Sequence, residues 1–355
     1  MRNSCLGDNF APVKNLKIMI MYRLTVILLF ICCHIVVSAQ EDSIRKMVFN
    51  GAVTVELNYG NNASDGNVTS KIDLPHLILN GDLHWGKGWS IISVFEYERF
   101  YEDGVWGNDF NNNFCTNKLY ITKQFSDEIH IKAGIIETPV GITNSEGPAL
   151  TIYDPESESG ILPLKWHETG ISFYGNKGKF GYQLSALAYI NNLFHRTKML
   201  GGAARLDYYP IEPLRIGVSG YYGKSCHGMI NRGRPEFMDD DNALAYWSMD
   251  FDYQQRGLLV DGSVIYCSDS NAKSVGIEAG FDILTLCNSY MQLIPFVRYD
   301  GLWGKTFQGK TKYTAGVNFS PFKNLILKSE YGIRCLNDGS TERMLDFCAG
   351  YTICF

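Results

Sequence analysis

Histidine, serine and carboxylate side chains are the first candidates for chemistry in this 355-residue chain, but their spacing does not favour a compact site. His76 and His84 would share one face of a strand, yet they lie far apart along it. His167 adjoins Glu168, so the two side chains would point to opposite faces. The run 217–220 lacks the last glycine of a nucleophile elbow. We therefore predict no enzyme, no metal and no cofactor. A hydrolase whose triad is assembled in space stays open as an alternative.

Charged side chains at alternate positions of apolar runs carry a clearer signal. Arg298 and Asp300, for example, alternate with Val297 and Tyr299. Side chains of a strand point to opposite faces with period two, so such a strand has one apolar and one charged face. We predict that the charged faces line an aqueous pore. Its basic residues would be Lys118, Lys132, Arg205, Arg215, Arg298, Lys310, Lys312, Lys328 and Arg334, and its acidic residues Glu96, Glu98, Glu168, Asp250, Asp252, Asp282 and Glu330.

The predicted inward faces hold more acids than bases. A path for phosphate should need clustered arginine and lysine, so we expect little ion preference or a weak preference for cations. Opposed acidic and basic walls, which would give a transverse field, are an equally good interpretation. The whole chain has a net charge of −5, which does not suggest nucleic-acid binding. Further acids assigned to the inward faces are Glu56, Asp82, Asp207, Asp261, Glu278, Asp300 and Asp346.

About sixteen strand-like runs, the run 273–284 among them, would position these charges. Tight turns rich in Gly or Pro, such as 86–88 and 176–178, alternate with long polar gaps, such as 60–70, 101–113 and 225–241. Loop lengths segregated in this way are typical of outer-membrane barrels, whereas a soluble sandwich, the alternative, does not require them. The sequence predicts an all-β transmembrane antiparallel barrel of about 16 strands, with short periplasmic turns and long extracellular loops. A barrel of this size leaves an aqueous channel unless it is plugged.

The first 39 residues have the pattern of an extended start followed by a secretory signal peptide. A basic flank ending at Arg23 precedes the apolar core 24–37, which is short for a membrane anchor, and a small-residue site ends at Ala39. We predict cleavage there, a short periplasmic N-terminus over 40–46, and one barrel domain over 47–355 in the outer membrane of a Gram-negative cell. Seven cysteines would remain, an odd number, and we favour free thiols.

The longest gap, 138–165, is the candidate for a constriction inside the pore. It contains four prolines, which limit its flexibility. An outward surface loop is the alternative. If the segment folds inward, its acids would face a basic wall formed by Lys310, Lys312, Lys328 and Arg334. The constriction-loop residues are then Glu146, Asp154, Glu156 and Glu158.

Two segments resemble the Bacteroidetes branch of the phosphate-selective porin O and P family. Within 118–191, a strand–turn–strand ends in Lys132-Ala-Gly, and the runs 138–141 and 166–170 look like the edges of the family's long third loop. The run 311–334 is similar to its hairpin near the C-terminus. The resemblance implies passive diffusion of small hydrophilic or ionic solutes, anions included, through a water-filled, usually trimeric barrel. A closed structural or ligand-binding barrel is the alternative function.

The last strand keeps its apolar face to the final residue, with Tyr351, Ile353 and Phe355 on that face. A terminal Phe resembles the signal by which the barrel-assembly machinery recognises its clients. The expected partners are therefore this machinery, the lipid bilayer with its lipopolysaccharide, and further copies of the chain in a homotrimer.

Overall fold

The computed structural model describes residues 47–355 except 65–66, 103–104, 107–113, 145–149, 164–165, 189–199, 225–242, 269–270, 288 and 306–307. The predicted signal peptide and the segment 40–46 lie outside the described residues, as do Glu146 and Cys226. Residues Phe49–Phe355 form one compact unit.

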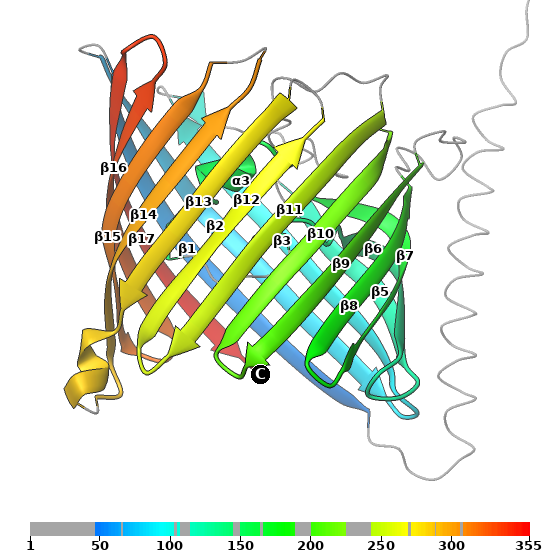
Figure 1. Ribbon diagram of the computed structural model, residues 1–355. Helices are drawn as coiled ribbons and strands as arrows, with labels where there is room; N and C mark the ends of the chain where they lie inside the picture. Colours follow the sequence, from blue (N-terminus) through cyan, green and yellow to red (C-terminus); the bar gives the residue numbers. More distant parts are fainter. Residues whose placement is uncertain are drawn as a thin grey trace, which may run out of the picture. The chain divides into compact units, whose positions relative to one another are not determined.

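The described strands form a single antiparallel sheet that closes on itself (Figure 1). The first strands are β1 (Val48–Ser64), β2 (Asn67–Trp85), β3 (Trp89–Glu102), β4 (Val105–Trp106), β5 (Phe114–Gln124), β6 (His130–Glu137), β7 (His167–Lys177), β8 (Phe180–Ala188) and β9 (Leu200–Ile211). The others are β10 (Leu214–Lys224), β11 (Ala243–Gln255), β12 (Leu258–Cys267), β13 (Ala272–Phe281), β14 (Gln292–Trp303), β15 (Lys310–Phe322), β16 (Leu325–Leu336) and β17 (Thr341–Cys354). Two short helical turns, α3 (Glu156–Ser159) and η2 (Ile283–Cys287), complete the described elements.

Sixteen of the described strands make the barrel wall, because β4 is a two-residue extension paired to the end of β3. β3 pairs directly with β5, and β1 pairs with β17 and closes the barrel. Tight turns connect strands at the end that holds Phe355, where Gly178 (φ 59°) and Gly257 (φ 84°) adopt the left-handed conformation that favours glycine. The prediction of a barrel of about 16 antiparallel strands is confirmed.

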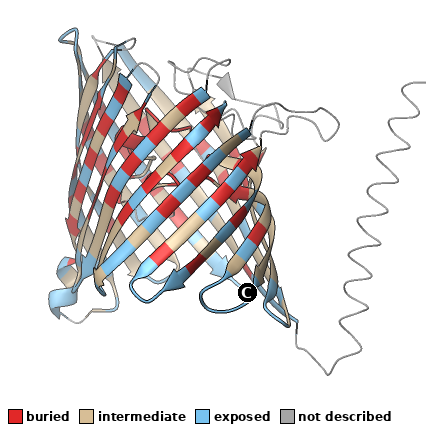
Figure 2. Cartoon of the chain, turned by 45° about the vertical axis from the view of Figure 1, so that its right-hand side comes forward, coloured by how far each residue is buried: buried red, intermediate tan, exposed pale blue. Residues whose placement is uncertain are grey.

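The two faces of the strands follow the predicted alternation. Trp247 and Val297 on the outer face are 63% and 60% exposed, whereas Arg298 next to Val297 is 4% exposed on the inner face. Figure 2 shows buried and exposed residues alternating along neighbouring strands. The outer surface is therefore a band of aliphatic and aromatic side chains, and the charges face the lumen. No helix in the described part of the chain is long and apolar enough to cross a bilayer.

Two local predictions are wrong. The polar gap expected over 60–70 is mostly strand, because β1 and β2 continue to Ser64 and from Asn67. The strand expected over 273–284 ends at Phe281. Asp282, predicted to line the pore, instead accepts backbone N–H groups of Leu284 at 3.2 Å and Leu293 at 3.0 Å. Its carboxylate accepts hydrogen bonds from backbone N–H groups of the connection between β13 and β14, so it stabilises this turn.

Candidate functional site

The segment 138–163, here called the inner loop, runs through the inside of the barrel over its described residues, 138–144 and 150–163. It leaves β6 and carries α3, which lies within the barrel in Figure 1. Its backbone N–H groups donate to inward carboxylates of three strands. Leu150 donates to Glu278 at 2.7 Å, Ile152 to Glu330 at 2.8 Å, and Ser157 to Asp300 at 3.1 Å. The strand side chains thus satisfy backbone groups that the loop does not pair within itself.

Glu156 lies against the basic wall. Arg334 Nε donates to both of its carboxylate oxygens at 3.0 Å, and the ammonium groups of Lys310 and Lys312 each lie 3.5 Å away. Arg334 also pairs with Glu342. Burial of the Glu156 carboxyl raises its pKa, but the hydrogen bond and charge of Arg334, with the two lysines, lower the pKa to about 2.

Two other predicted loop contacts differ from this pattern. Glu158 does not meet the basic wall; it accepts N–H groups of Ile142 at 2.9 Å and Thr143 at 2.8 Å, so it ties the loop to itself. Burial raises the pKa of the Glu158 carboxyl. Lys328 donates to the Thr151 carbonyl at 2.9 Å and not to a loop acid. Asp154 is half-buried.

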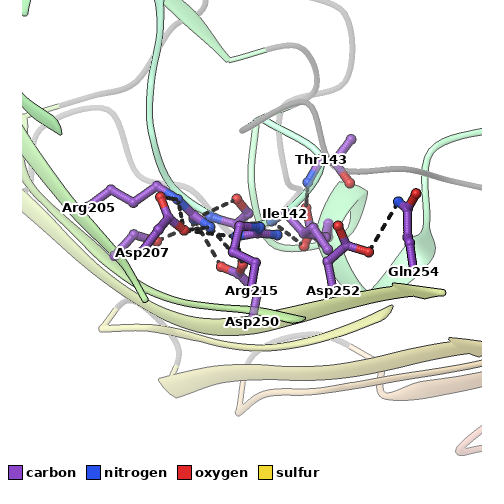
Figure 3. Close-up of polar contacts among 11 residues, drawn as sticks. Ile142, Thr143, Arg205, Asp207, Arg215, Asp250, Asp252 and Gln254 are labelled. Carbon is purple, nitrogen blue, oxygen red and sulfur yellow. Dashed lines mark hydrogen bonds and ion pairs between the residues drawn. The ribbon is translucent and has the colours of Figure 1, made fainter. Parts of the chain in front are cut away.

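Arg205 and Arg215 share two aspartates beneath the loop (Figure 3). Arg205 Nη2 lies 2.7 Å from Asp250 and 2.8 Å from Asp207, and Arg215 Nη1 lies 2.6 Å and 2.9 Å from the same two carboxylates. Arg205 Nη1 also donates to the Gly141 carbonyl at 3.2 Å. Asp252 lies apart from this group, where Gln254 donates to it at 3.3 Å.

Arg298 is the centre of a second buried network. Its side chain is 1% exposed and lies 3.0 Å from Asp300, 3.5 Å from Glu278 and 3.7 Å from Asp261. It also donates to the hydroxyl of Ser157 in α3 at 3.2 Å. Arg205, Arg298 and Arg334 therefore each hold both strand carboxylates and a part of the inner loop, and none is a free charge in the lumen.

An apolar core joins the inner loop to the wall, and the sequence reading missed it. Trp166 is fully buried, with its ring 4.7 Å from Tyr221 and 5.3 Å from Tyr246, both at 63°. The pattern of β10 and β11 gives a signal, because both faces become apolar toward the long-loop end. The other members are Ile136, Val140, Ile161, Leu162, Leu187, Ala203, Leu244, Ile265, Cys267, Ala272 and Leu302.

The wall formed by β1–β7 holds the remaining predicted lining residues. Lys132 pairs with Glu137 and lies over the rings of Tyr120 and Tyr174, at 5.4 and 4.9 Å. Lys118 is half-buried on the same face of β5 as Tyr120. Glu96 and Glu98 are buried beside His76, a residue that sequence reasoning set aside. Glu168 is 3% exposed, and neither of its carboxylate oxygens has a hydrogen-bond partner among the described residues.

The apolar residues at the end of the chain point outward: Tyr351 is 42%, Ile353 51% and Phe355 66% exposed. Phe355 exchanges backbone hydrogen bonds of 2.9 and 2.8 Å with Gly51 of β1. Six described cysteines are free thiols: Cys115, Cys267, Cys287, Cys335, Cys348 and Cys354.

Comparisons with known proteins show what this chain resembles. No protein-family model matches it. An uncharacterized protein of Aquifex aeolicus (strain VF5) is 32% identical over 140 residues, which is 39% of this chain and 30% of that protein. The match thus spans under a third of that relative.

Solved structures give a likeness over most of the chain. A loop L8 deletion mutant of OmpT, an outer membrane protein of Vibrio cholerae, has a TM-score of 0.58 at 10% identity, covering 87% of this chain and 99% of that one. An anion-selective porin from Comamonas acidovorans has a TM-score of 0.57 at 14% identity, covering 87% and 100%. In-vitro folded OmpT in its trimer form has a TM-score of 0.57 at 11% identity, covering 87% and 99%. The chain has the barrel fold of these outer-membrane proteins.

Proposed function

We propose that the protein is an outer-membrane porin, through which small hydrophilic or ionic solutes diffuse passively, with the inner loop as its constriction. This proposal rests on one observation: the inner loop crosses a charged barrel interior. Arginines and carboxylates of the barrel wall hold the loop there. Glu156, held by Arg334, is the clearest of these anchors. A loop fixed in this way narrows the lumen without unfolding the barrel.

The outer face supports a membrane location. Arg or Lys facing lipid at mid-bilayer costs about 2–4 kcal/mol, and the outer face carries rings and aliphatic groups such as Trp247 and Val297. The predicted signal peptide and the short turns beside Phe355 support an orientation with the turns in the periplasm and the long loops outside the cell. A homotrimer is our proposal for the assembly, because the resemblance implies one and a solved structure of the same fold is a trimer form.

We propose weak selectivity. Of the described residues, Arg205, Arg215, Arg298 and Arg334 are engaged with acids, so they offer no row of free cations to an anion. Phosphate preference, which the family resemblance would imply, has no such row to support it. Membership of the phosphate-selective porin O and P family stays a prediction that rests on 118–191 and 311–334.

A closed structural or ligand-binding barrel is the second candidate. The observation that favours it is the apolar core around Trp166, which fills part of the lumen with side chains packed as in a protein interior. An enzymatic role is not part of either proposal.

Liposome swelling separates these candidates. Vesicles containing the purified, heat-modifiable barrel should swell in sugars of small size and stop swelling as the sugars grow, and vesicles with heat-denatured protein should not swell. Swelling that is equal for native and denatured protein would favour the closed barrel.

A further inference from the structure

His76 lies among four carboxylates on the inner face of β1–β3. Its Nδ1 is 3.1 Å from Glu56 and 3.4 Å from Asp73, and its Nε2 is 2.7 Å from Glu96 and 3.3 Å from Glu98. The side chains of Asp73, Glu96 and Glu98 are at most 9% exposed, whereas that of Glu56 is 24% exposed. The group is thus buried in the wall and reaches lumen water through Glu56.

A β-bulge builds this group. In a regular strand Asp73 and His76 would point to opposite faces, because they are three residues apart. The pairing of β2 with β3 shifts register between these two residues, in the stretch that contains Pro75. The bulge turns both side chains to the inner face, where β3 supplies Glu96 and Glu98. This local irregularity explains why spacing along the chain did not reveal the group.

We propose that these residues bind one divalent transition-metal ion of the zinc type. Ligand atoms of Asp73, His76 and Glu98 all lie within 4.8 Å of one another. Ligands of a tetrahedral zinc ion, bound at about 2.0–2.2 Å, stand about 3.3–3.6 Å apart. The 3.3 Å between Nε2 and Glu98 and the 3.4 Å between Nδ1 and Asp73 each match that separation. They belong to different ring nitrogens, so binding one ion requires Asp73 or Glu98 to turn toward the nitrogen that ligates it.

Both ring nitrogens contribute to the site. Metal-ligating histidines usually donate their second N–H to a carboxylate, which fixes the ring and raises its basicity. Here each ring nitrogen of His76 faces carboxylates. If one nitrogen binds the ion, the N–H of the other nitrogen can still donate to a carboxylate. One imidazole with carboxylates suits a borderline ion such as Zn²⁺ better than Ca²⁺, which prefers oxygen ligands alone.

Asn58 gives a second, independent indication. The residue is 4% exposed, and its Nδ2 lies 3.3 Å from Asp73 and 3.4 Å from His76 Nδ1. Its Oδ1 is buried and has no hydrogen-bond partner in the part of the chain that the structure describes. A half-turn of the amide would bring this oxygen to the position of the nitrogen, between Asp73 and His76, where an ion would satisfy it.

Zinc titration of the purified, folded barrel tests the site independently of whether the protein conducts. Isothermal titration should show one Zn²⁺ per wild-type chain, with affinity at least about tenfold weaker in His76→Gln. His84→Gln is the matched control, since His84 lies on the same strand but bonds to Ser90, and it should bind as wild type. Zn²⁺ should also raise the unfolding temperature of the wild type and of His84→Gln, and it should leave that of His76→Gln unchanged.

Three results would overturn the proposal. They are no zinc binding by the wild type, equal binding by His76→Gln, and Ca²⁺ binding as tight as Zn²⁺ in both proteins. If His76→Gln does not give a heat-modifiable barrel, Glu98→Gln takes its place with the same expected loss.

Discussion

The inner surface of the barrel has two unlike halves. On the wall formed by β9–β17, here called the covered wall, Arg205, Arg298 and Arg334 each contact both strand carboxylates and the inner loop. On the wall formed by β1–β6, here called the His76 wall, the ring of Tyr153 in the inner loop lies 5.9 Å from the ammonium of Lys71. Both walls have the same alternation of apolar and charged residues. The two walls therefore differ because the inner loop packs against the covered wall.

The difference indicates where solutes would pass. Side chains of the covered wall are ion-paired and packed beneath the loop, as in a protein interior. The His76 wall presents carboxylates, with Glu56 reaching lumen water. We expect the diffusion path to follow the His76 wall, and a divalent ion bound there would lie beside that path.

Removing the inner loop should give the largest effect. Replacing 139–163 by a short Gly-Ser turn removes the anchors at Glu156 and Glu158 and exposes the covered wall to water. Single-channel conductance should rise several-fold while the barrel stays heat-modifiable on gels. Unchanged conductance in a folded barrel would mean that the loop does not define the narrowest point.

Breaking one buried ion network should destabilise the barrel strongly. Arg205→Ala leaves Asp250, a fully buried carboxylate, with Arg215 alone, and breaking a buried pair costs about 3–5 kcal/mol. Lys177→Ala is the control, because Lys177 and its partner Glu128 are exposed, and loss of such a pair costs about 0–1 kcal/mol. Urea unfolding of both variants measures the difference; equal losses would contradict a packed covered wall.

The Glu156 anchor should resist acid. Its folded pKa of about 2 lies below its ordinary value of 4.5, so its stabilising contribution is complete above about pH 4.5 and is lost as the pH falls through about 2. The stability difference between wild type and Glu156→Gln should be constant from about pH 7 to 5 and vanish near pH 2. A difference that disappears already at about pH 5 would show that Arg334 does not hold the carboxylate.

Ion selectivity should be slight. Because the arginines of the covered wall are neutralised by acids, reversal potentials in a KCl gradient should lie near zero or on the cation side. Glu56→Gln, on the His76 wall, should move the potential further than Asp252→Asn. A strong anion preference, or block of chloride current by phosphate, would show that the ion-paired arginines still select for anions.

The smallest effect concerns the seam between β1 and β17. A Cβ at Gly51 would meet the Phe355 ring at 2.4 Å, but that ring is 66% exposed and can turn aside. Gly51→Ala should therefore change unfolding free energy by no more than about 0.5 kcal/mol.

Phe355→Ala, which removes the proposed assembly signal, should lower the amount of barrel in the outer membrane. Equal levels of the two variants would contradict that role.

The sequence predicted the strands and their faces, because period-two alternation encodes both directly. Trp247 faces outward and Asp250 inward as the pattern indicates. The pattern does not encode which inward charges meet, since this depends on the stagger of the strands and on the path of the loop. Glu156 and Arg334 lie close in space but far apart in sequence.

Three features escaped the pattern for physical reasons. A bulge between Asp73 and His76 reverses the alternation locally, and only Pro75 marked it in the sequence. Asp282 ends a strand early because its carboxylate bonds the turn. Tyr246 is inward and apolar because Trp166, the residue before β7, packs on it, and this tertiary contact is not encoded in the local pattern.

Single-channel recording of the wild-type protein in planar bilayers tests the central claim, diffusion through a lumen that the inner loop narrows. The purified, heat-modifiable barrel should insert with stable, ohmic conductance steps of uniform size. A correctly folded barrel that inserts and stays electrically silent would contradict it.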